Sequence, residues 1–222
     1  MNKLLVAAVS LSALAVPAVA ADMPLKTPVY KAPVSPETNW SGLYVGGHAG
    51  YMWGRSSVWD EGDLVEKDAP TNGFVGGALA GVNWQTGAWV LGLEGDFGWT
   101  DAHGTGVASN PAASNRYDFN WTSHIRGRVG YATSNVLWFV AGGLALADFD
   151  YTQGSSGITV SGSTFTGWTL GGGADIAINP SWIARVEYLH DDFGDKNFLI
   201  NGDPYRVKLT GETVRGALMY KF

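Results

Sequence analysis

Two features on which many proteins depend, cysteine and long apolar runs, are missing or nearly so from this 222-residue sequence. The absence of cysteine excludes disulfides, thiolate metal sites and cysteine nucleophiles. A helix that crosses a membrane needs about 20 consecutive apolar residues, and only residues 4–21 approach such a run. The sequence therefore does not indicate a bundle of membrane-spanning helices.

Basic residues are also scarce: Lys and Arg number 14 against 20 Asp and Glu, so the net charge is −6. Nucleic-acid-binding proteins are normally basic, and we expect no nucleic-acid partner. Among the four histidines, His48 and His124 fall on different predicted strands, and Ser123 would point away from its neighbour His124. No Ser/His/acid set is recognisable, so we predict no catalytic residue, no enzyme activity and no cofactor.

Residues 1–20 have the pattern of a secretory signal peptide. Lys3 supplies a positive start, residues 4–16 form a short apolar core, and Ala18 and Ala20 frame a small-residue cleavage site. Cleavage one residue later, after Ala21, is the alternative.

Residues 21–39 form a proline-rich leader. Four prolines within so short a stretch favour extended chain without a core and are found at positions 24, 28, 33 and 36. We expect this segment to lie in the periplasm as a spacer ahead of a folded domain at 40–222.

Glycine and aromatic residues are abundant, with 31 Gly, 10 Trp and an aromatic content of 13%. Glycine allows strands to bend at barrel corners, and Trp and Tyr favour membrane interfaces. A mean hydropathy of zero suits a barrel whose polar interior offsets an apolar exterior.

Alternation of apolar and polar residues, the period of a β-strand, recurs eight times. The predicted strands are 40–54, 73–84, 89–100, 120–131, 136–149, 164–178, 181–190 and 212–222. The pattern predicts an all-β fold, an eight-stranded antiparallel transmembrane β-barrel.

The clearest strand is 89–100, where Trp89 and Trp99 bracket an outward face that alternates with Glu94 and Asp96. Two aromatic ends are what two membrane interfaces require. Strand 136–149 is apolar on both faces, so its register stays open; our choice places Trp138 outward.

The connections alternate in length. Short turns of two to four residues separate strands around 85–88, 132–135 and 179–180, whereas 55–72, 101–119, 150–163 and 191–211 are predicted as long loops. Membrane barrels have short periplasmic turns and long outer loops, and an even strand count places both ends of the barrel domain in the periplasm.

Charged residues collect on the inward face of the predicted barrel. The set consists of Glu94, Asp96, Arg126, Arg128, Asp175, Arg185, Glu187, Arg215 and Lys221. An eight-stranded barrel is just wide enough for side chains to fill it, and buried charges must be paired. We interpret the set as a salt-bridge core, with a narrow polar channel as the alternative. A soluble lipocalin-type barrel would show the opposite faces.

Two acidic groups are weak candidates for cation binding. One is Asp191, Asp192 and Asp195, for which a solvated loop is the preferred interpretation; the other lies within 60–68. Neither matches a known loop motif, so we predict no metal site.

Several stretches together resemble the small outer-membrane immunogenic proteins of alphaproteobacteria, within the OmpA-like, opacity-type barrel superfamily. They cover nearly all of the chain after the signal peptide and are found at 21–24, 39–47, 167–175, 182–188 and 214–222. Asp175 departs from the Glu common in relatives.

The resemblance implies a bacterial outer-membrane location and insertion by the barrel-assembly machinery, which would read Phe222, Tyr220 and Leu218 at the C-terminus. It also implies an envelope-integrity role with surface-exposed loops, and outer-membrane lipid and lipopolysaccharide as surroundings. We expect a monomer, because eight strands suffice to close the barrel and leave no edge. Two alternatives remain: a narrow porin, and a surface receptor or adhesin, for example for haemin through His103 or His190.

Overall fold

The computed structural model describes residues 38–60, 63–107, 114–152, 159–200 and 203–222. The predicted signal peptide and nearly all of the leader lie outside these residues. Within the described chain, no helix is long and apolar enough to cross a membrane.

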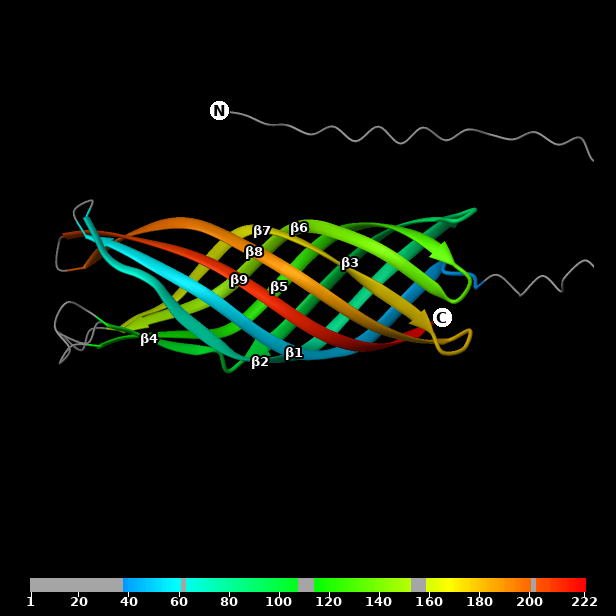
Figure 1. Cartoon of the computed structure of the whole chain (residues 1–222), viewed down its shortest axis with the longest axis horizontal. Helices are drawn as coiled ribbons and strands as arrows, with labels where there is room; N and C mark the ends of the chain where they lie inside the picture. Colours follow the sequence, from blue (N-terminus) through cyan, green and yellow to red (C-terminus); the bar gives the residue numbers. More distant parts are fainter. Residues whose placement is uncertain (1–37, 61–62, 108–113, 153–158, 201–202) are drawn as a thin grey trace, which may run out of the picture. The chain divides into compact units, whose positions relative to one another are not determined.

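The described chain forms one antiparallel sheet that closes on itself, because the first strand pairs with both the second and the last (Figure 1). The strands are β1 Gly42–Asp60, β2 Asp63–Thr86, β3 Trp89–Thr100, β4 His103–Val107, β5 Ser114–Thr133, β6 Val136–Thr152, β7 Thr159–Ala177, β8 Trp182–Ile200 and β9 Asp203–Lys221. Both β3 and β4 lie between β2 and β5 and are parts of one wall position. The wall therefore has eight positions, and the predicted eight-stranded antiparallel barrel is confirmed.

The stagger of the strands is fixed by their pairing. Following opposed residues from Tyr44 through Gly81, Glu94 and each later strand returns to β1 at Gly54, ten residues further along. Stagger and strand number together set the tilt and width of a barrel. One consequence is that residues far apart in sequence share a level in the lumen.

Tight turns join the strands at one end, which we call the short-turn end. Gly87 and Ser134 adopt left-handed φ values of 60° and 53° in two of these turns, as two-residue hairpins require. In the third turn, Asn179 Oδ1 accepts hydrogen bonds from the backbone N–H of Ser181 and Trp182.

The prediction of long loops was wrong over most of their length, because these segments form strands. At the opposite end, the tip end, pairing continues up to Asp60↔Asp63 and Ile200↔Asp203. These segments are rich in polar residues and glycine, a composition that is typical of loops. Backbone pairing nevertheless continues there, because paired strands satisfy one another's backbone N–H and C=O groups.

The two faces of the wall follow the predicted alternation. In β3 every odd residue from Trp89 to Leu93 is exposed, whereas Val90 and Glu94 are buried. The open register of the strand at 136–149 is now fixed: Trp138 is 59% exposed and Leu137 is fully buried, as we had chosen.

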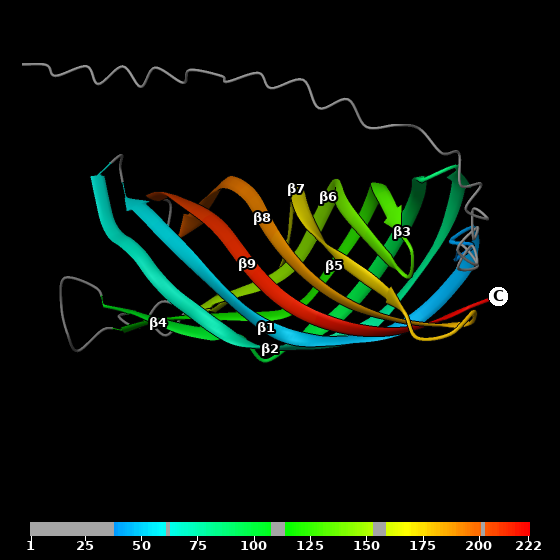
Figure 2. The ribbon, with the colours of Figure 1, turned by 45° about the vertical axis from the view of Figure 1, so that its right-hand side comes forward.

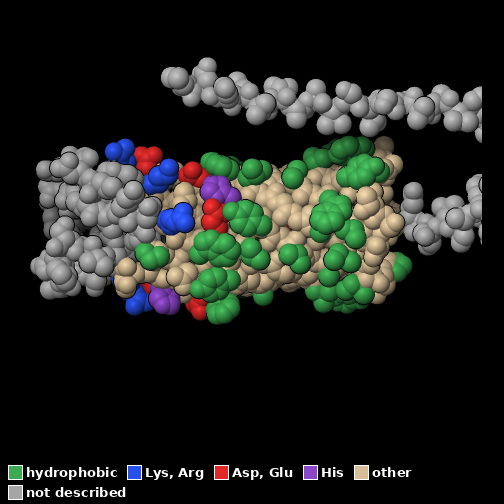
Figure 3. Space-filling view, in the orientation of Figure 1, with side chains coloured by type: hydrophobic (Ala, Val, Ile, Leu, Met, Phe, Trp, Pro, Cys, Tyr) green, Lys and Arg blue, Asp and Glu red, His purple; other side chains and the backbone are tan. Residues whose placement is uncertain are grey.

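Apolar and aromatic side chains form a band around the outside of the barrel (Figure 3). Near the short-turn end, Trp89 packs edge-on against Tyr131, with ring centroids 5.3 Å apart. Toward the tip end, Phe97 stacks on Trp121 at 5.6 Å. On the face in Figure 3, charged side chains lie beyond this band, toward the tip end.

Glycine has two different roles in the wall. At Gly143, which faces the lumen, an added Cβ would lie 2.0 Å from the carbonyl oxygen of Ile125, so only glycine fits. At Gly127, which faces outward, an added Cβ would meet nothing within 4 Å.

Candidate functional site

The lumen holds a continuous network of ion pairs, carried by β3, β5, β7, β8 and β9. Alternation sends the charged residues inward, and the stagger brings them to adjoining levels. Eight members of the predicted set are buried there: Glu94 and Asp96 from β3, Arg126 and Arg128 from β5, Asp175 from β7, Arg185 and Glu187 from β8, and Arg215 from β9.

Arg126 lies at the centre of the network. Its Nη1 is 2.7 Å from Glu187 Oε1 and its Nη2 is 2.5 Å from Glu94 Oε1. Asp96 Oδ2 lies 3.4 Å from the same Nη2. One fully buried guanidinium therefore joins carboxylates from β3 and β8, on opposite parts of the wall.

A second group of pairs lies closer to the short-turn end. Arg185 Nε donates to Asp175 Oδ1 at 2.6 Å and its Nη1 donates to Glu94 Oε2 at 2.7 Å. Arg128 Nη2 donates to Asp175 Oδ2 at 2.6 Å. The planar ends of both arginines also lie over the Phe139 ring, at 4.8 and 4.1 Å, a cation–π arrangement.

Arg215 extends the network toward the tip end. It donates to Glu187 Oε2 at 2.9 Å and to both carboxylate oxygens of Asp96 at 3.1 Å. The forked geometry matches a bidentate guanidinium–carboxylate pair.

Three residues of the network were not in the predicted set. His124 Nδ1 lies 2.8 Å from Asp96 Oδ1 and its Nε2 lies 3.4 Å from Asp191 Oδ1, while the Tyr44 hydroxyl donates to Glu94 Oε2 at 2.6 Å. The inward positions of Tyr44 and His124 followed from alternation, but neither carries a fixed charge that would have signalled pairing.

The interpretation of Asp191 as part of a solvated acidic loop was wrong. It is buried in the lumen, whereas Asp192 accepts a hydrogen bond from the backbone of Gly194 and Asp195 lies 3.9 Å from Arg206. The three carboxylates thus have separate partners. Among the described residues, no group of three or more His, Cys, Asp or Glu is arranged to hold a metal ion.

Lys221, the ninth member of the predicted set, is not part of the network. It is opposed to Tyr44 at the rim, and its Nζ donates to the backbone oxygen of Asn39. Met219 and Trp40, both buried, belong to an apolar layer. Alternation correctly gave the face of Lys221, but that layer separates its end of β9 from Arg215.

Apolar layers lie on both sides of the charges. Along β8 the inward residues run from Ile183 through Arg185 and Glu187 to Phe193, all of them buried. The layer near the short-turn end consists of Trp40, Tyr44, Leu79, Val90, Leu137, Ile183 and Met219. Toward the tip end, the buried apolar side chains include Met52, Val75, Phe119, Phe165, Phe193 and Leu209. The lumen is therefore filled rather than open.

The exposed histidines do not share a site. His103 lies on β4, with its Nδ1 2.8 Å from the Asp101 carbonyl oxygen. His190 lies within β8 rather than at a loop edge, with its Nδ1 2.8 Å from Glu212 Oε1. Strands β4 and β8 are separated by β5, β6 and β7, so the two rings cannot bind one ligand together.

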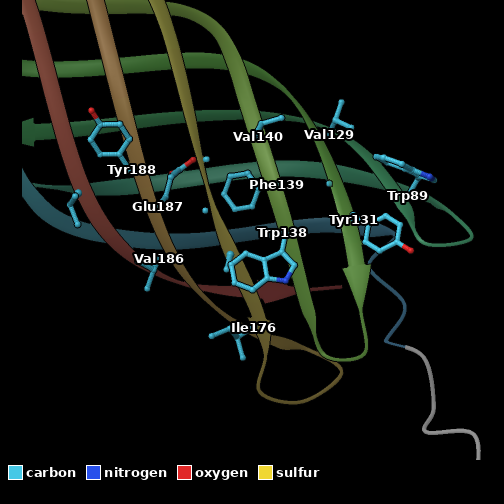
Figure 4. A pocket seen from close by; sticks show the side chains of 15 residues that line it. Trp89, Val129, Tyr131, Trp138, Phe139, Val140, Ile176, Val186, Glu187 and Tyr188 are labelled. Atoms are coloured by element: carbon cyan, nitrogen blue, oxygen red, sulfur yellow. The ribbon is translucent and has the colours of Figure 1, made fainter. Parts of the chain in front are cut away.

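A shallow hollow on the outer wall is lined by apolar side chains, including Trp138, Val140 and Val186 (Figure 4). Gly172, which lies opposite the outward Val140 and Tyr188, contributes no side chain to this part of the surface. Tyr131, Tyr188 and the buried Glu187 are also among the lining residues. The outward apolar side chains belong to the apolar band, so the hollow faces the hydrocarbon of the membrane.

The signal-cleavage residues Ala18 and Ala20 lie outside the described residues, as do the side chains of the acidic group within 60–68. The C-terminal residues are described: Phe222 is 73% exposed and Tyr220 and Leu218 share its outward face. Tyr220 packs edge-on against both Phe222 and Trp182.

Comparison with known proteins agrees with this architecture. Residues 5–222 match the family described as outer membrane protein beta-barrel domain. The 31 kDa outer-membrane immunogenic protein of Brucella melitensis biotype 1 is 34% identical over 224 residues, covering 92% of this chain and 93% of the relative. The 22 kDa outer membrane protein of Rhizobium leguminosarum bv. viciae is 31% identical over 192 residues, covering 86% of this chain and 82% of the relative.

Among solved structures, Neisserial surface protein A is similar, with 15% identity, a TM-score of 0.48, and coverage of 82% of this chain and 98% of that one. The resemblance drawn from sequence motifs is confirmed by the family match and the curated relatives. The chain is an outer-membrane protein and belongs to the outer membrane β-barrel domain family, alongside the outer-membrane immunogenic proteins.

Proposed function

We propose that this protein is a structural component of the outer membrane: a closed, non-conducting barrel that supports envelope integrity and carries its long strand ends outside the cell. The observation that carries the proposal is the filled lumen. A layer of ion pairs lies between two layers of buried apolar side chains, so an ion would have to displace both kinds of packing.

The same packing argues against a narrow porin. Arg126 and Arg215 each contact at least two carboxylates, and separating a buried pair to admit an ion costs several kcal/mol even after the surroundings relax. Trp40 is fully buried at the short-turn end. A conducting path needs binding weak enough for ions to leave, whereas these charges are already neutralised by one another.

The proposal includes the surroundings expected from the sequence. The apolar band would contact outer-membrane lipid and, in the outer leaflet, lipopolysaccharide. The exposed Phe222 at the end of β9 would be available to the barrel-assembly machinery. Because the sheet closes within the membrane and leaves no edge there, a monomer suffices; we propose no catalytic activity.

Conductance of the refolded mature protein in a planar bilayer tests the closed lumen. We expect no steady openings once a heat-dependent gel shift has verified folding. The matched variant Glu187→Gln should be equally silent, because the apolar layers remain. Steady wild-type openings whose ion selectivity changes in Glu187→Gln would overturn the proposal in favour of a porin.

The envelope role has its own test. A strain without the protein should leak a periplasmic reporter enzyme and become more sensitive to detergent, and a plasmid copy of the wild-type chain should restore both. An intact barrier in the deletion strain would remove the integrity role even if the lumen is closed.

A further inference from the structure

A short segment ahead of β1 lies at the mouth of the barrel, at the short-turn end. Residues 39–41, which we call the strap, precede the first ladder pairs of β1, Gly42↔Asn83 and Tyr44↔Lys221. In both ribbon views the start of the described chain lies at the same end as the C-terminus (Figures 1 and 2). Among the described residues, the strap therefore stands next to both ends of the barrel domain without belonging to a sheet ladder.

The strap carries one large side chain into the lumen. Trp40 is fully buried and belongs to an apolar cluster whose other buried members come from six different strands. These members are Tyr44 of β1, Leu79 of β2, Val90 of β3, Leu137 of β6, Ile183 of β8 and Met219 of β9. Because β1 and β9 are the first and last strands of the chain, this socket is complete only once the sheet has closed.

Hydrogen bonds hold the strap on both sides of β1. The Trp40 N–H donates to Gln85 Oε1 at 2.7 Å and the Gln85 N–H donates to Ser41 Oγ at 2.9 Å, which ties the strap to the end of β2. On the other side, Lys221 Nζ of β9 donates to the backbone oxygen of Asn39. Strands β2 and β9 are the two neighbours of β1, so the strap links the three strands that meet where the barrel closes.

A single glycine sets the direction of the strap. Gly42 has a φ of 129°, in a region that residues with a side chain rarely adopt. An added Cβ there would also lie 3.1 Å from the backbone oxygen of Phe222. Because the strap forms no ladder pair, a change of the dihedral angles at Gly42 can move Trp40 out of the mouth while the pairs beyond Gly42 stay intact.

One polar atom inside the mouth has no partner. The indole N–H of Trp40 is buried without a hydrogen-bond acceptor among the described residues, and an unpaired buried donor disfavours the buried position. Apolar packing therefore holds the side chain in place, together with the hydrogen bonds of the strap backbone. Phenylalanine at position 40 would keep most of that packing and remove the unpaired donor.

We propose that the strap is a latch for the closed barrel. It swings on Gly42 after β1 has met β9, Trp40 fills the mouth, and the β1–β9 seam is then held against reopening from the short-turn end. The order follows from the socket, because Met219 lies on the last strand and joins Tyr44 only at closure. A side chain that packs after the slow step changes the unfolding rate and leaves the folding rate almost unchanged.

Refolding and unfolding rates of the full mature chain in lipid vesicles test the latch. Trp40→Ala should unfold roughly tenfold faster or more and refold within about twofold of the wild-type rate. The matched variant Trp40→Phe should unfold at close to the wild-type rate. If Trp40→Ala slows refolding as strongly as it speeds unfolding, Trp40 packs before closure and the proposal is overturned.

Hydrogen exchange shows where the latch acts. In Trp40→Ala, amides that join β1 to β9 around Val45↔Tyr220 should exchange roughly tenfold faster. Amides that join β5 to β6 around Tyr131↔Trp138, at the same end of the barrel, should keep their wild-type rates. Equal acceleration at both places would contradict a latch on the β1–β9 seam.

The hinge is tested by a variant that keeps Trp40 and every hydrogen-bonding residue of the strap. Gly42→Ala should unfold faster than wild type, because alanine disfavours the observed φ. The double variant Gly42→Ala, Trp40→Ala should unfold within about twofold of Trp40→Ala alone, since the two changes disable one device. Effects that multiply in the double variant would contradict the hinge. Conductance plays no part in these experiments, so the latch and the closed lumen are tested separately.

Discussion

Replacing Arg126 by Met is expected to destabilise the barrel, because the guanidinium is fully buried between carboxylates of two strands. Methionine is similar in length, so packing changes less than charge. After the change, Glu94 still contacts Arg185 at 2.7 Å and Glu187 still contacts Arg215 at 2.9 Å. Neither carboxylate is left without a cation.

The size of the effect follows from these remaining contacts. Removing one partner of a buried pair costs about 3–5 kcal/mol, and the surviving arginines place Arg126→Met near the lower end, at about 3 kcal/mol. The variant Glu187→Gln should cost about 2 kcal/mol by the same reasoning. In the double variant one positive and one negative charge are lost together, so the two losses should overlap by about 1–3 kcal/mol.

Unfolding by urea in lipid vesicles, followed by tryptophan fluorescence, measures all three variants, and the ten tryptophans provide the signal. Arg116→Met is the control, because Arg116 forms its pair with Asp118 on the exposed surface and its loss should leave the curve unchanged. Strictly additive losses in the double variant would refute the view that the lumen charges act as a connected network.

Two further predictions concern the wall and its end. Gly143→Ala should destabilise the barrel by about 1–3 kcal/mol through overpacking, whereas Gly127→Ala should change stability by less than about 0.5 kcal/mol, as judged from the same urea curves. Equal effects would show that the wall shifts at little cost to separate an added Cβ at Gly143 from the Ile125 carbonyl oxygen. Removing Phe222 should reduce the amount of folded barrel recovered from the outer membrane in cells while leaving refolding into vesicles intact, and a parallel loss in both measurements would indicate a structural role instead.

The faces of most strands could be predicted from the sequence, because a period of two survives in every membrane-crossing segment except 136–149, which is apolar on both faces. Trp89 and Trp99 mark the two ends of one outward face, and Glu94 and Asp96 lie between them on the inward face. The number of wall positions and the short turns followed from the same pattern.

Contacts across the lumen could not be predicted in the same way. Which residues meet there depends on the ten-residue stagger, and alternation carries no information about stagger. The sequence therefore placed Lys221 among the charges and left His124 and Asp191 out. The tip-end segments were interpreted as loops because they are rich in polar residues and glycine, which are typical of connections.

The ion pairs of the lumen also bear on the order of events during folding. Arg215 and Asp96 are 119 residues apart in sequence, and Arg185 and Glu94 are 91 apart. Contacts of such high sequence separation form late, because a long segment of chain must be ordered before they are made. Hydrated charges on an open sheet would have to shed water together when β1 meets β9. Closure should therefore be the slow step of assembly, and the same desolvated pairs should delay reopening, which would give the barrel a long kinetic lifetime in the membrane.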